Sequence, residues 1–221
     1  MILNINFRLA FLAIVFIFWM VLALGEDNKE DNWKNMSISE IDNSLDQFEG
    51  GSHDFEVAEN SFNASIRECS SSTSEQCVGA YYGKGRVLND NRENYREAIK
   101  YFDQALKIDP SCCQCLDQKG WSLYELEDIN LAISTADAAL KICPMNAHIW
   151  NNKGIYYYML NDYQKALECF NKAVECDPKC GDAWWDKGKA HIKLGQENDA
   201  ALAFAKAKEC GTSEQTTEQE E

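Results

Sequence analysis

The sequence lacks the patterns that build catalytic and phosphate-binding sites. It has no glycine-rich phosphate loop, because its one Gly-Lys-Gly stretch, Gly83 to Gly85, is too short to cradle a phosphate. Only three histidines occur, His53, His148 and His191, and no Ser-His-acid arrangement or pair of carboxylates stands out from the acidic background. The sequence therefore predicts a protein that is not an enzyme and needs no cofactor.

Positive charge is scarce as well. The chain has 21 Lys and Arg against 36 Asp and Glu, for a formal net charge of −15. The excess lies at the flanks: residues 26–77 hold 13 acidic and three basic side chains, and residues 212–221 hold four acidic and no basic ones, whereas residues 78–211 are nearly balanced. No basic stripe is left that would bind a nucleic acid, so we predict no such partner.

The three prolines of the chain mark a repeated pattern. Between Val78 and Gly211 a set of one Gly, one Ala, one aromatic residue or Ala, and a second Ala recurs four times, about 34 residues apart. The landmarks are Gly85, Gly120, Gly154 and Gly188, then Ala98, Ala132, Ala166 and Ala200, then Phe102, Ala136, Phe170 and Phe204, then Ala105, Ala139, Ala173 and Ala207, with Pro110, Pro144 and Pro178 closing the first three copies. Small residues let two helices approach closely and Pro ends a helix, so each copy is predicted to be a helical hairpin.

This pattern resembles the tetratricopeptide repeat. The third copy matches at every landmark, with Trp150, Gly154, Tyr157, Ala166, Phe170, Ala173 and Pro178. The resemblance implies an all-α fold, a right-handed α-solenoid of three to four hairpins in residues 78–211, divided as 78–112, 113–146, 147–180 and 181–211. It also implies a function in protein–protein interaction.

The resemblance further implies a concave groove lined by the first helix of each hairpin. The predicted partner-binding residues are Tyr82, Arg86, Asp117, Trp121, Tyr124, Asn151, Ile155, Tyr158, Trp185, Lys189 and Ile192. Aromatic side chains dominate this set, as they do in binding sites for peptides or partner helices. The alternative is that Trp121 and Trp185 only pack against neighbouring repeats. Family members that hold the C-terminal carboxylate of cytosolic chaperones use Lys, Arg and Asn in the groove, and Asp117 departs from that pattern.

The chain begins with an apolar run. Leu9 to Leu24 contains 16 apolar residues and no polar one, and small residues flank Leu24. Residues 1–25 therefore resemble a secretory signal peptide cleaved after Gly25. The alternative is an uncleaved membrane anchor formed by residues 9–24, although a helix of that length spans about 24 Å against a hydrocarbon core of about 30 Å. Both interpretations predict an exported protein, secreted or extracytoplasmic.

Residues 26–77 form an acidic segment rich in Asn and Ser, predicted to be largely disordered, and residues 212–221 form an acidic disordered tail. One short amphipathic helix is predicted at Ser39 to Phe48, which either caps the first repeat or stays transient in a tether. Asn35 and Asn63 begin N-glycosylation sequons.

Ten cysteines in an exported chain predict disulfides. Eight of them occupy repeat positions along one edge, where the start of one helix lies beside the end of the next: Cys77, Cys112, Cys113, Cys115, Cys143, Cys176, Cys180 and Cys210. Reasonable pairs are Cys143 with Cys113 or Cys115, and Cys180 with Cys210. The other two cysteines, at positions 69 and 169, lie off that edge.

We therefore predict an exported adaptor or assembly factor that binds a protein or peptide. Two alternatives stay open at this point. In one, the protein handles thiols or metal through the cysteine edge, with Cys112, Cys113 and Cys115 as the sharpest candidate, although the flanking His and Cys of such sites are missing and no metal is predicted. In the other, the chain is a structural component attached to a surface.

Overall fold

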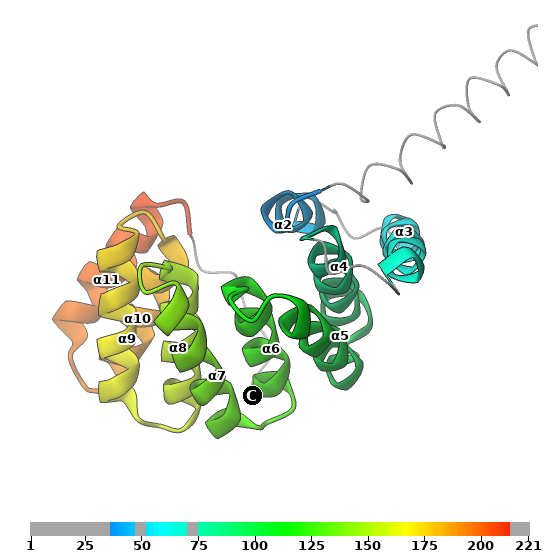
Figure 1. The fold of residues 1–221 in the computed structure, drawn as a ribbon. Coiled ribbons are helices and arrows are strands. Elements are labelled where there is room, and N and C mark those ends of the chain that lie inside the picture. The colour runs from blue at the N-terminus through cyan, green and yellow to red at the C-terminus, as the bar shows by residue number, and fades with distance from the viewer. Residues whose placement is uncertain (1–35, 47–51, 70–74, 213–221) are drawn as a thin grey trace, which may run out of the picture. The chain divides into compact units, whose positions relative to one another are not determined.

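The computed structural model describes residues 36–46, 52–69 and 75–212 (Figure 1). All regular structure in these residues is helical, with α2 at Ile38–Asp46, α3 at Ser52–Glu68, α4 at Glu75–Arg92, α5 at Tyr95–Ile108, α6 at Cys113–Glu125, α7 at Ile129–Ile142, α8 at Ala147–Met159, α9 at Tyr163–Cys176, α10 at Gly181–Lys193 and α11 at Glu197–Glu209. Among the described helices, none combines the length and apolar character that a membrane span requires. The predicted signal segment 1–25, the sequon at Asn35 and residues 213–221 of the predicted tail lie outside the described residues. The predicted all-α fold is confirmed.

The chain divides into two compact units, Met1–Arg92 and Glu93–Glu221. The boundary falls inside the predicted first repeat, 78–112, so its helices α4 and α5 belong to different units, and each unit is described by itself. In the first unit α3 packs along α4. The ring of Phe62 lies so close to Gly83 that any side chain there would clash with it. Glycine is therefore needed at this helix contact.

Helix α3 lies in the segment whose composition predicted disorder. Phe55, Ala58, Phe62 and Ser65 are buried and recur three or four positions apart, which places them on one helical face. Most of the other positions of α3 are polar or charged, so the mean composition conceals this apolar stripe. The second sequon, at Asn63, lies within this helix and is partly exposed.

Helix α2 begins one residue earlier than predicted, and Ser37 caps it. The Ser37 hydroxyl accepts a bond from the Glu40 N–H at 3.4 Å, while the Glu40 carboxylate accepts one from the Ser37 N–H at 2.7 Å. This reciprocal pair is a capping box. The hydrogen bonds from the Ser37 backbone and hydroxyl lower the pKa of Glu40. Ile41 and Leu45 are buried, and α2 contacts α4.

The second unit is a solenoid of helical hairpins. Helices α6 and α7, α8 and α9, and α10 and α11 form three hairpins, which stand side by side in chain order in Figure 1, and α5 packs on α6. The turn of each hairpin contains one residue with positive φ: Glu127 at 64°, Asn161 at 59° and Gly195 at 72°. These residues are 34 positions apart, so the repeat is present in the backbone as well as in the side chains. The predicted α-solenoid is confirmed.

Repeated contacts explain the landmarks of the sequence. Phe170 lies over Gly154 and Phe204 lies over Gly188, each so closely that a Cβ on the glycine would clash with the ring. The indole N–H of Trp150 donates to the carbonyl of Pro144 at 2.9 Å, and that of Trp184 donates to the carbonyl of Pro178 at 3.0 Å. Helices α8 and α10 are thus each tied to the turn that precedes them.

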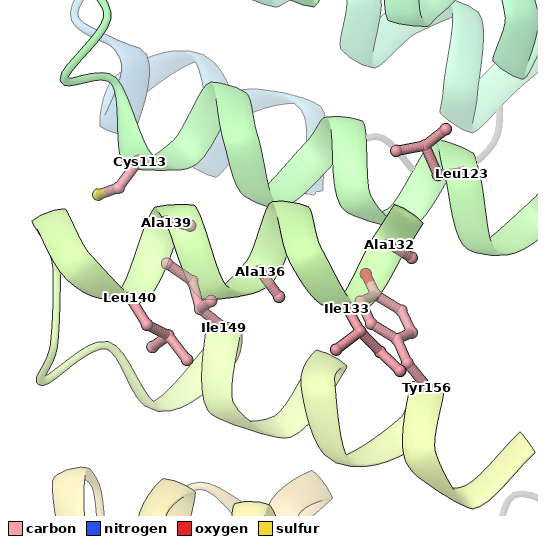
Figure 2. Packing of buried hydrophobic residues seen from close by; sticks show 9 residues of the cluster. All are labelled: Cys113, Leu123, Ala132, Ile133, Ala136, Ala139, Leu140, Ile149 and Tyr156. Carbon is pink, nitrogen blue, oxygen red and sulfur yellow. The ribbon is translucent and has the colours of Figure 1, made fainter. Parts of the chain in front are cut away.

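Hairpin α6–α7 departs from this contact. Ala136 stands where the later repeats have Phe, and Figure 2 shows the ring of Tyr156 entering the same core from α8. A Cβ placed on Gly120 would lie 3.4 Å from the Tyr156 hydroxyl and not against a phenylalanine ring. The space left by the small Ala136 is therefore filled by the following repeat.

Three disulfides lie in the described residues. Cys113 pairs with Cys143, joining the start of α6 to the end of α7, and Cys112 pairs with Cys115 at the N-terminus of α6. The third joins Cys69 to Cys77, although position 69 was placed off the predicted cysteine edge. The free thiols are Cys169, Cys176, Cys180 and Cys210, so the structure does not contain the predicted pair between Cys180 and Cys210.

Candidate functional site

Two of the predicted groove residues, Tyr82 and Arg86 on α4, are covered by α2. The Tyr82 hydroxyl donates to the Asp42 carboxylate at 2.5 Å, and the Arg86 guanidinium bonds Asp42 at 2.5 Å and Asp46 at 2.8 Å. Burial raises the pKa of the Tyr82 hydroxyl well above its usual value, and the nearby Asp42 carboxylate adds to that rise. In the first unit this face of α4 is therefore occupied by the chain's own acidic helix.

The other nine predicted groove residues lie on the first helices of the three hairpins. Helix α6 contacts α8, and α8 contacts α10. Their side chains fall into two groups: Asp117 and Asn151 are buried, whereas Trp121, Tyr124, Ile155, Tyr158, Trp185, Lys189 and Ile192 are partly or fully exposed. We call these nine residues, together with His148, Asn152 and Asp186, the groove face.

A polar ladder runs along the groove face. The Asn152 amide donates to Asp117 Oδ1 at 3.0 Å, which joins α8 to α6. The Asn151 amide donates to Asp186 Oδ2 at 3.1 Å, which joins α8 to α10. Both bonds link residues 35 positions apart, so each pairs the fifth residue of one repeat with the sixth residue of the next.

Each of the two carboxylates has a second partner, and that partner reaches it from solvent. His148 Nδ1 lies 2.8 Å from Asp117 Oδ2, and Lys189 Nζ lies 2.6 Å from Asp186 Oδ1. The side chains of His148 and Lys189 are 65% and 47% exposed, whereas the two carboxylates are buried. Buried carboxylates need such donors, because an unpaired charge away from water is costly.

One acceptor in this ladder lacks a donor. Asn151 is only 6% exposed, and its Oδ1 atom has no hydrogen-bond partner. Its orientation is dictated by Asp186, because a rotated amide would bring two oxygens together. The buried Oδ1 is therefore a vacant acceptor in the same amide group that donates to Asp186, and buried acceptors in native proteins are normally satisfied.

Aromatic rings flank the ladder. Trp121 packs against Tyr124 with centroids 5.1 Å apart, and Tyr124 stacks on Tyr156 at 5.4 Å. Trp185 packs on Phe204 of its own hairpin at 4.7 Å. Burial raises the pKa of Tyr124, with smaller contributions from Glu125 and Asp186. Both tryptophans therefore pack on rings of their own hairpins, and both keep an exposed part.

The cysteines form no comparable site. Cys112, Cys113 and Cys115 are buried as well as disulfide-bonded. Burial raises the pKa of the free Cys169 thiol to about 11 and also raises that of Cys180, which keeps both thiols protonated at neutral pH. Within the described ranges, no group of three or more His, Cys, Asp or Glu side chains is placed to hold a metal ion.

The predicted partner-binding set lacks three residues of the groove face, His148, Asn152 and Asp186. Asn152 and Asp186 do not stand at a groove position of the repeat, since both occupy its sixth place. The available signal was chemical: among the last three repeats, position five of one repeat and position six of the next are a carboxylate and an amide in both comparisons.

Comparison with known proteins agrees with this architecture. Residues 147–180 and residues 78–112 each match a family model described as the tetratricopeptide repeat. A search of curated proteins finds no match.

Solved structures of MamA share the fold. The structure of MamA from residue 41 to its end, from Desulfovibrio magneticus RS-1, has 22% identity and a TM-score of 0.62, covering 85% of this chain and 98% of that one. A double mutant of MamA RS-1 has 21% identity and a TM-score of 0.62, covering 83% and 94%. A further MamA crystal structure has 19% identity and a TM-score of 0.61, covering 72% and 90%.

Proposed function

Since this chain is a tetratricopeptide-repeat protein, we propose that its groove face on α6, α8 and α10 binds a protein or peptide partner, and that the protein acts as an adaptor or assembly factor outside the cytoplasm. A scaffold role in protein–protein interaction follows from the repeats themselves. The position of the binding surface and the export of the protein are the proposal.

The observation that carries this proposal is the exposure of apolar side chains on one face of three successive helices. Partly exposed aromatic residues stand on each of them, with Trp121 on α6, Tyr158 on α8 and Trp185 on α10. Ile192 adds an apolar side chain that is 51% exposed. Large aromatic side chains held in place by neighbours are the usual anchors of protein interfaces.

Export is supported by the cysteines. Disulfides persist in oxidising compartments and are rare in the cytosol. The pair Cys113–Cys143 joins two helices across 30 residues of chain, which suits a structural role. The thiol-handling alternative is not favoured, because the cluster Cys112 to Cys115 is buried and its sulfurs are joined in disulfides.

The groove is tested by site-specific photocrosslinking in the native host. A photoreactive residue replaces Ile192 on the groove face or Leu202 on α11, which is 68% exposed and serves as the matched control. We expect one defined protein adduct from position 192, its loss in Trp121→Ala and Trp185→Ala, and no such adduct from position 202. Equal adducts from both positions, or adducts unaffected by the tryptophan changes, would contradict the proposal.

Export is tested by intact mass of the protein from the same host, with alkylation before and after reduction. We expect a chain that starts at Glu26 and has four thiols reactive without reduction after unfolding, which are Cys169, Cys176, Cys180 and Cys210. Ten reactive thiols would contradict the proposal. If the chain is full length and contains disulfides, the protein is exported but stays anchored in the membrane and is not secreted.

A further inference from the structure

The centre of the groove face is richer in acceptors than its own donors can satisfy. Two buried carboxylates, Asp117 and Asp186, accept hydrogen bonds from α8, and the Asn151 Oδ1 on α8 is buried without a partner. We call Asp117, Asn151 and Asp186 the acceptor centre. A group that completed it would have to bring hydrogen-bond donors and, beside two carboxylates, positive charge.

The donors that now reach the carboxylates can move aside. His148 and Lys189 approach Asp117 and Asp186 from solvent, and both side chains are largely exposed. The amide donors from Asn152 and Asn151 are by contrast buried and fixed. A partner's cation that replaced them would keep both buried carboxylates paired, so the exchange leaves no buried charge without a partner. The imidazole of His148 and the ammonium group of Lys189 therefore occupy positions that an incoming cation can take.

The surroundings of the acceptor centre also suit a cation. Lys189 Nζ lies 6.0 Å from the centre of the Tyr158 ring, so this part of the groove already holds an ammonium group near an aromatic face. The negative charge of Asp186 contributes to the raised pKa of the Tyr124 hydroxyl, which shows that the two groups interact. Aromatic rings next to carboxylates provide both attractions that a guanidinium group uses.

We infer that the acceptor centre binds a basic side chain of the partner, an arginine or a lysine, placed between the aromatic side chains of the groove face. This inference rests on the proposed function and adds the chemistry of the partner. Arginine fits best, because its planar fork of five N–H groups can reach the Asn151 oxygen and a carboxylate together. A carboxylate or phosphate from the partner is disfavoured, since Asp117 and Asp186 would repel it.

The test uses the full chain with its disulfides formed and a random peptide library displayed on phage. Peptides are selected on the protein, and those whose binding is lost with Trp121→Ala or Trp185→Ala are kept as groove-dependent. We expect these peptides to be enriched in an arginine or lysine flanked by apolar residues. Replacing that residue by glutamine is expected to weaken binding at least about tenfold.

Protein variants then locate the contact. Asp186→Asn and Asp117→Asn preserve shape and remove one charge each, and each is expected to weaken the arginine peptide about tenfold while leaving its glutamine version unchanged. The matched control is Asp137→Asn, which removes a carboxylate that pairs with Lys153 outside the groove face. That control is expected to change binding less than about twofold.

The outcomes separate the two proposals. Groove-dependent peptides without a basic residue, or with acidic ones, would overturn the inference and leave the proposed function standing. Peptides whose binding ignores both tryptophans would overturn the proposed function and the inference with it. Unchanged binding in both Asp variants, together with a crystal structure that places only a water molecule on Asn151 Oδ1 in the peptide complex, would also overturn the inference.

Discussion

Hairpin α8–α9 fills the contact between its helices with Phe170 over Gly154, whereas hairpin α6–α7 has Ala136 in that place and borrows Tyr156 from the following repeat. The two hairpins also differ in their ends, because α6–α7 is closed by the disulfide Cys113–Cys143 and no described disulfide joins α8 to α9. Hairpin α8–α9 thus packs its two helices with its own side chain. Hairpin α6–α7 packs the same contact with a side chain of the next repeat and adds a disulfide. In such a stack the stability of one repeat depends on its neighbours.

The largest loss of stability is expected in hairpin α8–α9, whose helices pack around its own Phe170 ring. Phe170→Ala removes a fully buried ring and should destabilise the protein by about 3–5 kcal/mol. The control Ala136→Gly removes one methyl group at the same repeat position and should cost about 1 kcal/mol. Urea unfolding of both variants measures the difference, and equal costs would show that the rings do not carry the contact.

The next effect concerns the covalent closure of α6–α7. Replacing Cys113 and Cys143 together by Ser should destabilise the protein by about 3 kcal/mol, because a cross-link across a loop of 30 residues restricts the unfolded chain. Cys176→Ser removes a free thiol and should change stability by less than about 0.5 kcal/mol. Denaturant midpoints compare the two, and a midpoint unaffected by loss of the pair would mean that the disulfide adds nothing to the packing.

A double-mutant cycle examines the borrowed side chain. Ala136→Phe alone should overpack the core against Tyr156 and cost about 1–3 kcal/mol. Combined with Tyr156→Ala, the new Phe can occupy the space over Gly120, so the double variant should be more stable than the sum of the two single changes predicts. Strict additivity of the unfolding free energies would contradict the exchange of roles between Ala136 and Tyr156.

The smallest effect compares ion pairs that bridge neighbouring hairpins. Lys119 bonds Asp103 and Lys153 bonds Asp137, each at 2.6 Å, whereas Asn171 stands 16 positions before Lys187 where the other repeats have Asp. Burial lowers the pKa of Lys187, so its charged form disfavours folding at neutral pH, and this cost fades as pH rises through the lowered pKa.

Asn171→Asp should restore the missing pair. We expect a gain of about 0.5 kcal/mol at low salt, reduced because Lys187 is partly exposed and the pair is screened. Asp137→Asn should lose a similar amount in the neighbouring repeat. Thermal unfolding at two ionic strengths measures both changes, and a loss of stability in Asn171→Asp would contradict the expected pairing.

The hairpins could be predicted from the sequence because their landmarks record contacts that recur. The glycines at 154 and 188 face rings 16 residues later, and this spacing is visible without a structure. Helix α3 could not be predicted from composition, since Phe55, Ala58 and Phe62 form a stripe that the surrounding polar residues dilute. Position-specific periodicity, and not mean composition, carries that information.

The groove face was predicted in part. Repeat position places Asp117 and Asn151, but their partners Asn152 and Asp186 follow from pairing between repeats, which a pattern within one repeat does not contain. The covering of Arg86 by α2 could not be predicted either. It depends on the carboxylates of Asp42 and Asp46, which stand 44 and 40 residues earlier in the chain.

The polar ladder also requires the repeats to follow one another in a fixed order. Asp117 meets an amide in the next repeat, and Asn151 meets a carboxylate in the one after it. If the repeats 147–180 and 181–211 were exchanged, Asp117 would face Asp186, and two carboxylates would oppose each other in a buried place. These units therefore cannot be permuted like identical building blocks. A chain that grew by duplication would keep them in this succession once the ladder had formed.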